Sequence, residues 1–285
     1  MCNRLLPDMK RIALLSTLCA LISCSPKTFT VVQIADAQLG FDAAIKGQVP
    51  GAEYVNDLTY EATLLAQAVE YVNELNPDVV IFTGDQINLP ENTEQWDTFD
   101  SIISDINGEI VVRHLPGNHD VYHVKDGIDL TPFACRYGED RFVYHHDNVC
   151  LIGLNSNYIK YNDPREEEQY EWLQKTLSQL EKDTITLIFC HHSFFLTDIE
   201  EGDSYFPIQK DKRKRYFDLF AQYGVRGVYA GHLHNNSDGE YNGIAMKTST
   251  SSAYQLGEAQ PSVRVIEIQD GVVLKDGMHA FSQKK

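Results

Sequence analysis

Five short polar motifs of the sequence each directly follow an apolar run that predicts a β-strand. They are Asp36-Ala37-Gln38, Gly84-Asp85-Gln86, Gly117-Asn118-His119-Asp120, His191-His192 and Gly231-His232-Leu233-His234. Their carboxylates, amides and imidazoles form a mixed nitrogen and oxygen donor set, which suits Zn, Mn or Fe better than Ca. The set is larger than one ion needs, and two ions about 3.5–4 Å apart, bridged by a carboxylate, are suited to the hydrolysis of phosphate esters.

The elements that must position these motifs alternate between strands and helices over the first two-thirds of the chain. Strands are expected over 29–35, 78–83, 109–115, 141–145, 149–154, 184–190, 225–230, 244–248, 263–269 and 272–276, and helices over 56–75, 94–107, 164–181 and 211–223. Thr93 is the expected N-cap of the second helix, and Asp163 that of the third, before a proline at its first position. The pattern indicates a layered α/β sandwich with two sheets. Because ligand sites lie beyond the carboxyl ends of strands in open α/β sheets, all five motifs can converge in one cleft.

In this order the motifs resemble the calcineurin-like metallophosphoesterase superfamily, whose pattern is D-x-H/Q, G-D, G-N-H-D/E, H and G-H-x-H. The similarity runs from about residue 30 to 235. A closer similarity, to the calcineurin-like phosphoesterase domain-containing serine/threonine phosphatase group (the complete S-transactivated protein family), extends into the carboxyl-terminal third. It is carried by Gln33-Ile34-Ala35-Asp36-Ala37-Gln38-Leu39-Gly40, Tyr205-Phe206-Pro207-Ile208, Lys210, Arg213, Phe220, Gly224-Val225, Ser251-Ser252-Ala253, Gln255-Leu256-Gly257 and Val263-Arg264-Val265. The resemblance implies a four-layer α/β/β/α sandwich with two mixed β-sheets, the metallophosphatase fold, in one domain over residues 24–285.

The resemblance also implies a role for each motif. Asp36, Gln38, Asp85 and His234 would hold the first metal ion, and Asn118, His191, His232 and the bridging Asp85 would hold the second. The two ions would be divalent or trivalent Mn, Fe or Zn. The implied reaction is hydrolysis of a phosphomonoester by a hydroxide that bridges the ions, with His119 as the general acid that protonates the leaving alkoxide.

Two positions depart from patterns seen in related enzymes. Gln38 stands where many superfamily members have histidine, although the closer group shares the glutamine. Asn88 stands where the core phosphoprotein phosphatases have the second aspartate of G-D-x-x-D-R-G, which orients the catalytic histidine. Physical reasoning alone leaves His119 and His192 open as the acid. His191 is favoured over His192 as the metal ligand because the family pattern has a small residue or proline two positions later, here Ser193.

Two alternative functions remain open from the sequence. One is a phosphodiesterase that acts on nucleotides or lipid headgroups. The other is a metal-binding surface lipoprotein that has lost catalysis and serves as a binding module. The retained His119 and the seven intact ligand positions argue against the second alternative.

The composition and charge of the chain exclude several classes of protein and of binding partner. The 285 residues include 24 Lys and Arg against 41 Asp and Glu, a formal net charge of -17, with 43% hydrophobic residues. These values exclude a disordered tail protein, a collagen-like repeat and a polytopic membrane protein. The acidity argues against nucleic acid as the main partner, because phosphate-backbone binding depends on clustered Lys and Arg. Bound metal ions can invert the local charge, so a phosphorylated small molecule or phosphoprotein is still expected as substrate of a monomeric enzyme.

The amino terminus resembles a secretion signal. Arg4, Lys10 and Arg11 precede the apolar stretch 12–23, which ends at Cys24 and is too short to span a bilayer. Leu21-Ile22-Ser23-Cys24 resembles the bacterial lipobox, so residues 1–23 are expected to be a lipoprotein signal peptide and Cys24 the lipidated residue. The mature protein would then be lipid-anchored to a bacterial membrane outside the cytoplasm. A cytosolic amino-terminal helix is the alternative, and either Met1 or Met9 could be the true start.

Three cysteines remain besides the proposed lipid site Cys24. Cys135, Cys150 and Cys190 show no C-x-x-C spacing for zinc or redox chemistry. Cys150 and Cys190 lie in apolar strand-like runs and are expected to be buried thiols. A disulfide between Cys135 and Cys150 stays open, since sequence does not decide it.

Overall fold

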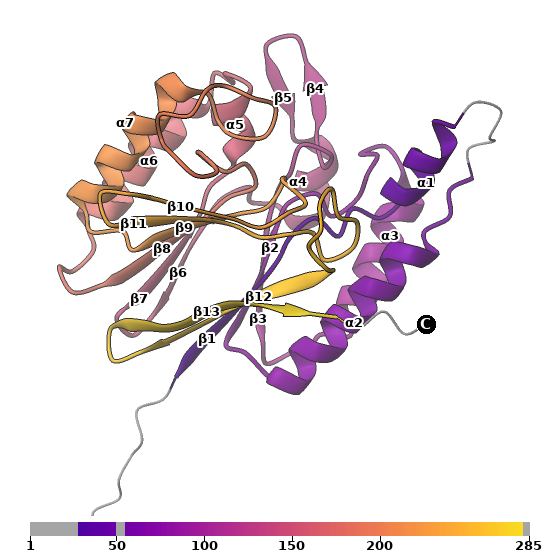
Figure 1. Cartoon of the computed structure of the whole chain (residues 1–285), viewed down its shortest axis with the longest axis horizontal. Coiled ribbons are helices and arrows are strands. Elements are labelled where there is room, and N and C mark those ends of the chain that lie inside the picture. The colour runs from indigo at the N-terminus through magenta and orange to yellow at the C-terminus, as the bar shows by residue number, and fades with distance from the viewer. Residues whose placement is uncertain (1–27, 50–54, 282–285) are drawn as a thin grey trace, which may run out of the picture.

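The structure, a computed structural model, describes residues 28–49 and 55–281. It contains two β-sheets packed face to face between two layers of helices, with a small two-stranded hairpin projecting at one end (Figure 1). This arrangement confirms the four-layer α/β/β/α sandwich with two mixed sheets.

The first sheet has the strand order β13-β12-β1-β2-β3. Its strands are β1 (Phe29–Ile34), β2 (Val79–Thr83), β3 (Val111–Leu115), β12 (Ser262–Gln269) and β13 (Val272–Ala280). β1, β2 and β3 are parallel, whereas β12 pairs antiparallel with β1 and β13 antiparallel with β12. The parallel strands end at the same edge, and the first three polar motifs follow them there.

The second sheet has the order β10-β11-β9-β8-β7-β6. Its strands are β6 (Phe142–His146), β7 (Val149–Gly153), β8 (Ile185–Phe189), β9 (Gly227–Ala230), β10 (Ser237–Tyr241) and β11 (Ile244–Thr248). β7, β8, β9 and β11 are parallel, and the edge strands β6 and β10 are antiparallel to their neighbours. Every residue of β7 and β8 is buried, as expected of central strands covered on both faces.

Three apolar clusters hold the four layers together. The first sheet packs its outer face against α2 (Thr59–Leu75) and α3 (Thr93–Ile103). The second sheet packs its outer face against α6 (Glu166–Ser178) and α7 (Lys210–Gln222). A third cluster, which includes Leu115, lies between the two sheets.

Several short elements were not predicted. They are α1 (Phe41–Gly47), α4 (Thr131–Tyr137), α5 (Ser156–Lys160), β4 (Tyr122–Val124), β5 (Gly127–Asp129) and β10. Each is seven residues or shorter, so hydrophobic periodicity gives little signal for it. The expected N-cap of α3 was one residue off: Asn92, not Thr93, accepts a hydrogen bond from the Gln95 backbone N–H at 3.2 Å.

The α6 boundary was also placed too early. The helix begins at Glu166, and Asp163 lies before its first turn instead of capping it. The Asp163 carboxylate binds the Arg165 side chain and the Ile128 backbone N–H, which ties β5 to the helix start.

Among the described residues, no helix combines the length and the apolar composition needed to cross a bilayer.

Candidate metal centre

The five polar motifs meet where the parallel strands of both sheets end. An unusual backbone accompanies them. Ten described residues other than glycine have a positive φ, and the proposed ligands Asp36, Gln38, Asp85, His232 and His234 are five of them, with φ between 40° and 67°. A left-handed backbone costs an L-residue about 1–2 kcal/mol, and such strain tends to concentrate at functional sites.

The geometry around His191 is that of a cation site. Its Nδ1 donates a hydrogen bond to the Thr83 carbonyl oxygen at 2.9 Å. In the neutral imidazole, Nε2 is then an acceptor. That Nε2 lies 3.2 Å from Asp85 Oδ2 and 3.0 Å from Asn118 Oδ1, which are also acceptors. Three convergent acceptors repel one another unless a cation lies among them.

The pKa values of His191, Asp36 and Asp85 also indicate that positive charge is favoured at this place. Burial disfavours the charged form of His191, but the Asp85 and Asp36 carboxylates outweigh it and raise the pKa of His191 to about 9. Burial also raises the pKa of the Asp36 carboxyl. Burial acts to raise the pKa of Asp85 as well, but the attraction of His191 and His119 outweighs it and lowers this pKa below its usual range. A proton on His191 thus supplies the charge that a metal ion would bring.

A second set of donors lies around Asp36. His234 donates from Nδ1 to the Tyr254 carbonyl oxygen, so its Nε2 is an acceptor that faces Asp36 Oδ1 at 3.6 Å. Both Asp36 oxygens accept from the His232 backbone N–H at 3.0 Å, which fixes the carboxylate. Gln38 points its amide nitrogen toward Asn88 Oδ1 at 3.5 Å, and its Oε1 is buried without a partner.

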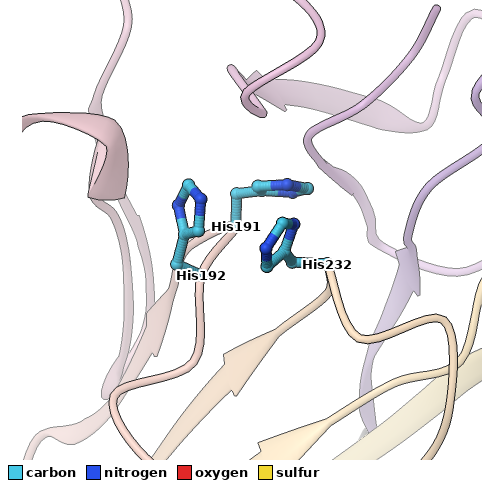
Figure 2. Close-up of side chains that lie close together, drawn as sticks. All are labelled: His191, His192 and His232. Atoms are coloured by element: carbon cyan, nitrogen blue, oxygen red, sulfur yellow. The ribbon is translucent and has the colours of Figure 1, made fainter. Parts of the chain in front are cut away.

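These residues fit the metal ions that the fold implies. Asp36, Asp85 and His191 offer three ligand atoms within 4.8 Å of one another, and so do His191, His192 and His232 (Figure 2). The unpartnered buried atoms Gln38 Oε1 and His232 Nε2 are what a ligand set without its cation would leave. The two groups share His191 and contain four of the predicted ligands, together with His192, which was not predicted to be one.

His119 is held at the edge of this centre. Its backbone N–H donates to Asp85 Oδ1 at 2.8 Å, and its ring Nδ1 donates to the Asn88 carbonyl oxygen at 2.9 Å. The partner of the imidazole is thus the backbone carbonyl of residue 88 and not a side-chain carboxylate. Nε2 is left as the nitrogen available for proton transfer.

Asp120 is a supporting residue that the sequence reading did not single out. Its Oδ1 accepts from the backbone N–H groups of Gln86 at 2.9 Å and Ile87 at 3.3 Å, and its Oδ2 accepts from Gly117 at 2.7 Å. It joins the loop after β2 to the loop after β3. A Cβ at Gly117 would lie 2.1 Å from Asp85 Oδ1, so the two loops can approach only with glycine there.

An aromatic loop covers part of the site. The Tyr205 and Phe206 rings lie 5.2 Å and 5.7 Å from the His232 ring. Lys160 holds the loop by donating to the carbonyl oxygens of Tyr205 at 2.7 Å and Pro207 at 2.5 Å. Arg213 of α7 is fully buried and donates to three more carbonyl oxygens, those of Ile208, Ile199 and Glu201.

The remaining sequence-predicted residues lie apart from the centre. Cys24 falls outside the described residues. Cys135 is exposed, Cys150 and Cys190 are buried, and all three are free thiols, so the open disulfide between Cys135 and Cys150 does not form in this structure. Burial raises the pKa of Cys150 to about 12, which makes it an inert thiol.

Known proteins share this sequence pattern and this fold. A family model described as calcineurin-like phosphoesterase matches residues 29–236. The serine/threonine-protein phosphatase CPPED1 of Bos taurus is 29% identical over 253 residues, which are 84% of this chain and 80% of the relative. A purple acid phosphatase from yellow lupin seeds has a TM-score of 0.62 at 15% identity, over 89% of this chain and 54% of that longer enzyme. A dimetal phosphatase from Danio rerio has a TM-score of 0.59 at 16% identity, over 89% and 99%. The chain therefore belongs to the calcineurin-like phosphoesterase family, and it is a metal-dependent hydrolase of phosphoester bonds.

Proposed function

We propose that the protein is a phosphomonoesterase with two metal ions, in which His119 is the general acid. The observation that carries the proposal is the convergence of three acceptors: Asp85 Oδ2 and Asn118 Oδ1 both lie within 3.2 Å of His191 Nε2. Asp36, Gln38, Asp85 and His234 would hold one ion, and Asp85, Asn118, His191 and His232 the other. When bound, the ions would act as Lewis acids toward the phosphoryl oxygens.

The chain's own contribution to the chemistry is proton transfer at His119. Protonated His119 would deliver a proton from Nε2 to the leaving oxygen, while Nδ1 keeps its hydrogen bond to the Asn88 carbonyl. That carbonyl stabilises the imidazolium and fixes the ring, because both ring nitrogens then carry hydrogen. The backbone bond from His119 to Asp85 holds the acid close to the bridging ligand.

The substrate is proposed to be a phosphomonoester, of a phosphoprotein or of a small molecule. The related CPPED1 proteins are named serine/threonine-protein phosphatases, which supports the phosphoprotein class. The rival activities are a phosphodiesterase on nucleotides or lipid headgroups and a metal-binding protein without turnover.

One assay separates these outcomes. The protein is loaded with Mn²⁺, its metal content is measured, and p-nitrophenyl phosphate is compared with its bis-ester. Faster turnover of the monoester supports the proposal, and faster turnover of the bis-ester contradicts it in favour of a diesterase. No turnover of either ester with stoichiometric metal would favour the binding protein. His145→Ala, an exposed change on β6, serves as the unaffected control.

We also propose that the mature protein is exported and lipid-anchored at Cys24. The support is the sequence of residues 1–24 alone: a basic start, a short apolar stretch and a lipobox-like end. Replacement Cys24→Ser should move the protein from the membrane fraction to the soluble fraction of the producing bacterium. Membrane association that survives the replacement would refute the anchor.

A further inference from the structure

His192 is a buried histidine at the metal centre without an assigned role. Its side chain has no exposed surface, and its ring lies 4.8 Å from the His191 ring and 4.5 Å from the His232 ring. Figure 2 shows its ring standing beside those of the other two histidines. Nε2 of His192 is buried and has no hydrogen-bond partner. A second metal ligand or a hydrogen-bond donor would both fit this description.

Ser156 decides between the two. This residue opens α5, and its Oγ accepts from the backbone N–H groups of His191 at 3.1 Å and His192 at 2.8 Å. A third contact, of 3.1 Å, joins Ser156 Oγ to His192 Nδ1. A hydroxyl has two acceptor lone pairs and one hydrogen. Both lone pairs are occupied, so the hydroxyl hydrogen must go to Nδ1.

The tautomer of His192 follows from that contact. Nδ1 accepts a hydrogen bond and carries no proton, so the neutral ring carries its proton on Nε2. A metal bound at Nε2 would force the proton onto Nδ1. Ser156 Oγ would then face three donors, with its own hydrogen unpartnered, at a cost comparable to a lost buried hydrogen bond. His191 has the opposite arrangement, with Nδ1 donating to Thr83 and Nε2 free to ligate.

We infer that His192 is a substrate-binding residue, whose Nε2–H donates a hydrogen bond to a phosphoryl oxygen, and is not a metal ligand. This inference rests on the proposed function for the identity of the acceptor. The donor lies beside His191 and His232, which would hold one of the two cations, and the substrate's anionic oxygens are the acceptors that arrive there on binding. The Tyr161 ring, 5.7 Å away and nearly perpendicular, packs against the imidazole and limits its rotation.

The tautomer can be measured without turnover. Long-range ¹H–¹⁵N spectra of histidine-labelled, metal-free protein should show the neutral His192 ring protonated at Nε2 and unprotonated at Nδ1. Protonation of His192 at Nδ1 in that spectrum would overturn the inference. Ser156→Ala removes the bond that selects the tautomer, so His192 should then show a mixture of the two forms.

Metal content and phosphate binding give the second test. His192→Ala should keep the metal stoichiometry of the wild type, while inorganic phosphate binds the Mn²⁺-loaded protein roughly 10–100-fold more weakly, the scale of a hydrogen bond to a charged group. His192→Gln, whose amide N–H can replace the Nε2–H, should restore phosphate binding to within about threefold of wild type, if the bond itself matters. His145→Ala is the matched control.

The outcomes separate this inference from the proposed function. Loss of one metal equivalent in His192→Ala, or unchanged phosphate affinity, would overturn the role of His192. Failure of the wild-type protein to hydrolyse any phosphomonoester would refute the proposed function instead, and calorimetry with phosphate would still test the hydrogen bond.

Discussion

Gly231, the first residue after β9, lies directly against the Asp36 carboxylate. A Cβ built at this position would be 2.5 Å from Asp36 Oδ2 and 3.1 Å from Ala35 Cβ. The closer approach is 0.5 Å short of the 3.0 Å below which real Cβ atoms are essentially never found. In a Gly231→Ala variant the carboxylate must therefore retreat, because the fixed strand end cannot.

The expected consequence is loss of metal affinity at the Asp36 site. Ligand distances in metal sites tolerate deviations of about 0.2 Å, so a retreat of this size takes the carboxylate out of range. The retreat also stretches its hydrogen bonds to the His232 backbone, now 3.0 Å. We expect Mn²⁺ to bind this site at least about 10–100-fold more weakly, the range seen when groups that orient a ligand are lost. Overpacking should lower the stability of the metal-free protein by about 1–3 kcal/mol.

The assay is isothermal titration of chelator-treated protein with Mn²⁺, followed by elemental analysis after gel filtration. Gly108→Ala is the matched control, since its Cβ would meet nothing within 4 Å. Circular dichroism shows whether each variant is folded. A folded Gly231→Ala protein that binds Mn²⁺ with wild-type stoichiometry and affinity would refute Asp36 as a ligand in this position.

Three further predictions concern the acid, a buried histidine and the aromatic loop. His119→Ala should keep its metal and lose about 10²–10⁴-fold in the rate of p-nitrophenyl phosphate hydrolysis, and an unchanged rate would remove His119 from the mechanism. Burial lowers the pKa of His114 to about 3, so between about pH 6.5 and pH 3 the unfolded chain binds a proton that the folded protein does not. The free energy of unfolding therefore decreases as the pH is lowered through this range, by up to about 1.4 kcal/mol per pH unit. Urea unfolding at pH 7 and pH 5 should show a smaller loss for His114→Phe, and equal losses would contradict this. Lys160→Met removes the ammonium group that binds three carbonyl oxygens of the aromatic loop. Limited proteolysis should then cut near residues 204–207 faster than in the control Lys214→Met, which changes an exposed lysine. Equal rates of cleavage would count against this role of Lys160.

Much of the scaffold could be predicted because its central strands are unbroken apolar runs. Val149–Gly153 and Ile185–Phe189 are buried on both faces, and such runs leave one structural solution in an alternating α/β chain. The motifs that follow the strands could be grouped for the same reason, since parallel strands end together. The short hairpin of β4 and β5 could not be predicted, because three-residue strands carry no periodicity.

The supporting contacts of the site could not be predicted from the sequence, because they join residues far apart in the chain or involve backbone atoms. Asp120 bonds to Gln86 across 34 residues, and His119 bonds to a backbone carbonyl 31 residues away. A backbone partner leaves no trace in the residue type, so Asn88 gave no clue to its role. The tautomer of His192 depends on three simultaneous contacts of the Ser156 hydroxyl, and these contacts exist only in the folded protein.

The left-handed backbone at the proposed ligands has a consequence for how such a site can change over time. At Gln38, with φ of 40°, a glycine would relieve the strain and favour the folded state, yet it would remove a donor atom. The same conflict holds at Asp36, Asp85, His232 and His234. Selection for thermal stability alone would therefore favour replacement of these ligands by glycine, one position at a time. Any laboratory evolution of this chain toward heat resistance should keep a metal-dependent screen in place, or the most stable survivors will be the ones that can no longer bind metal.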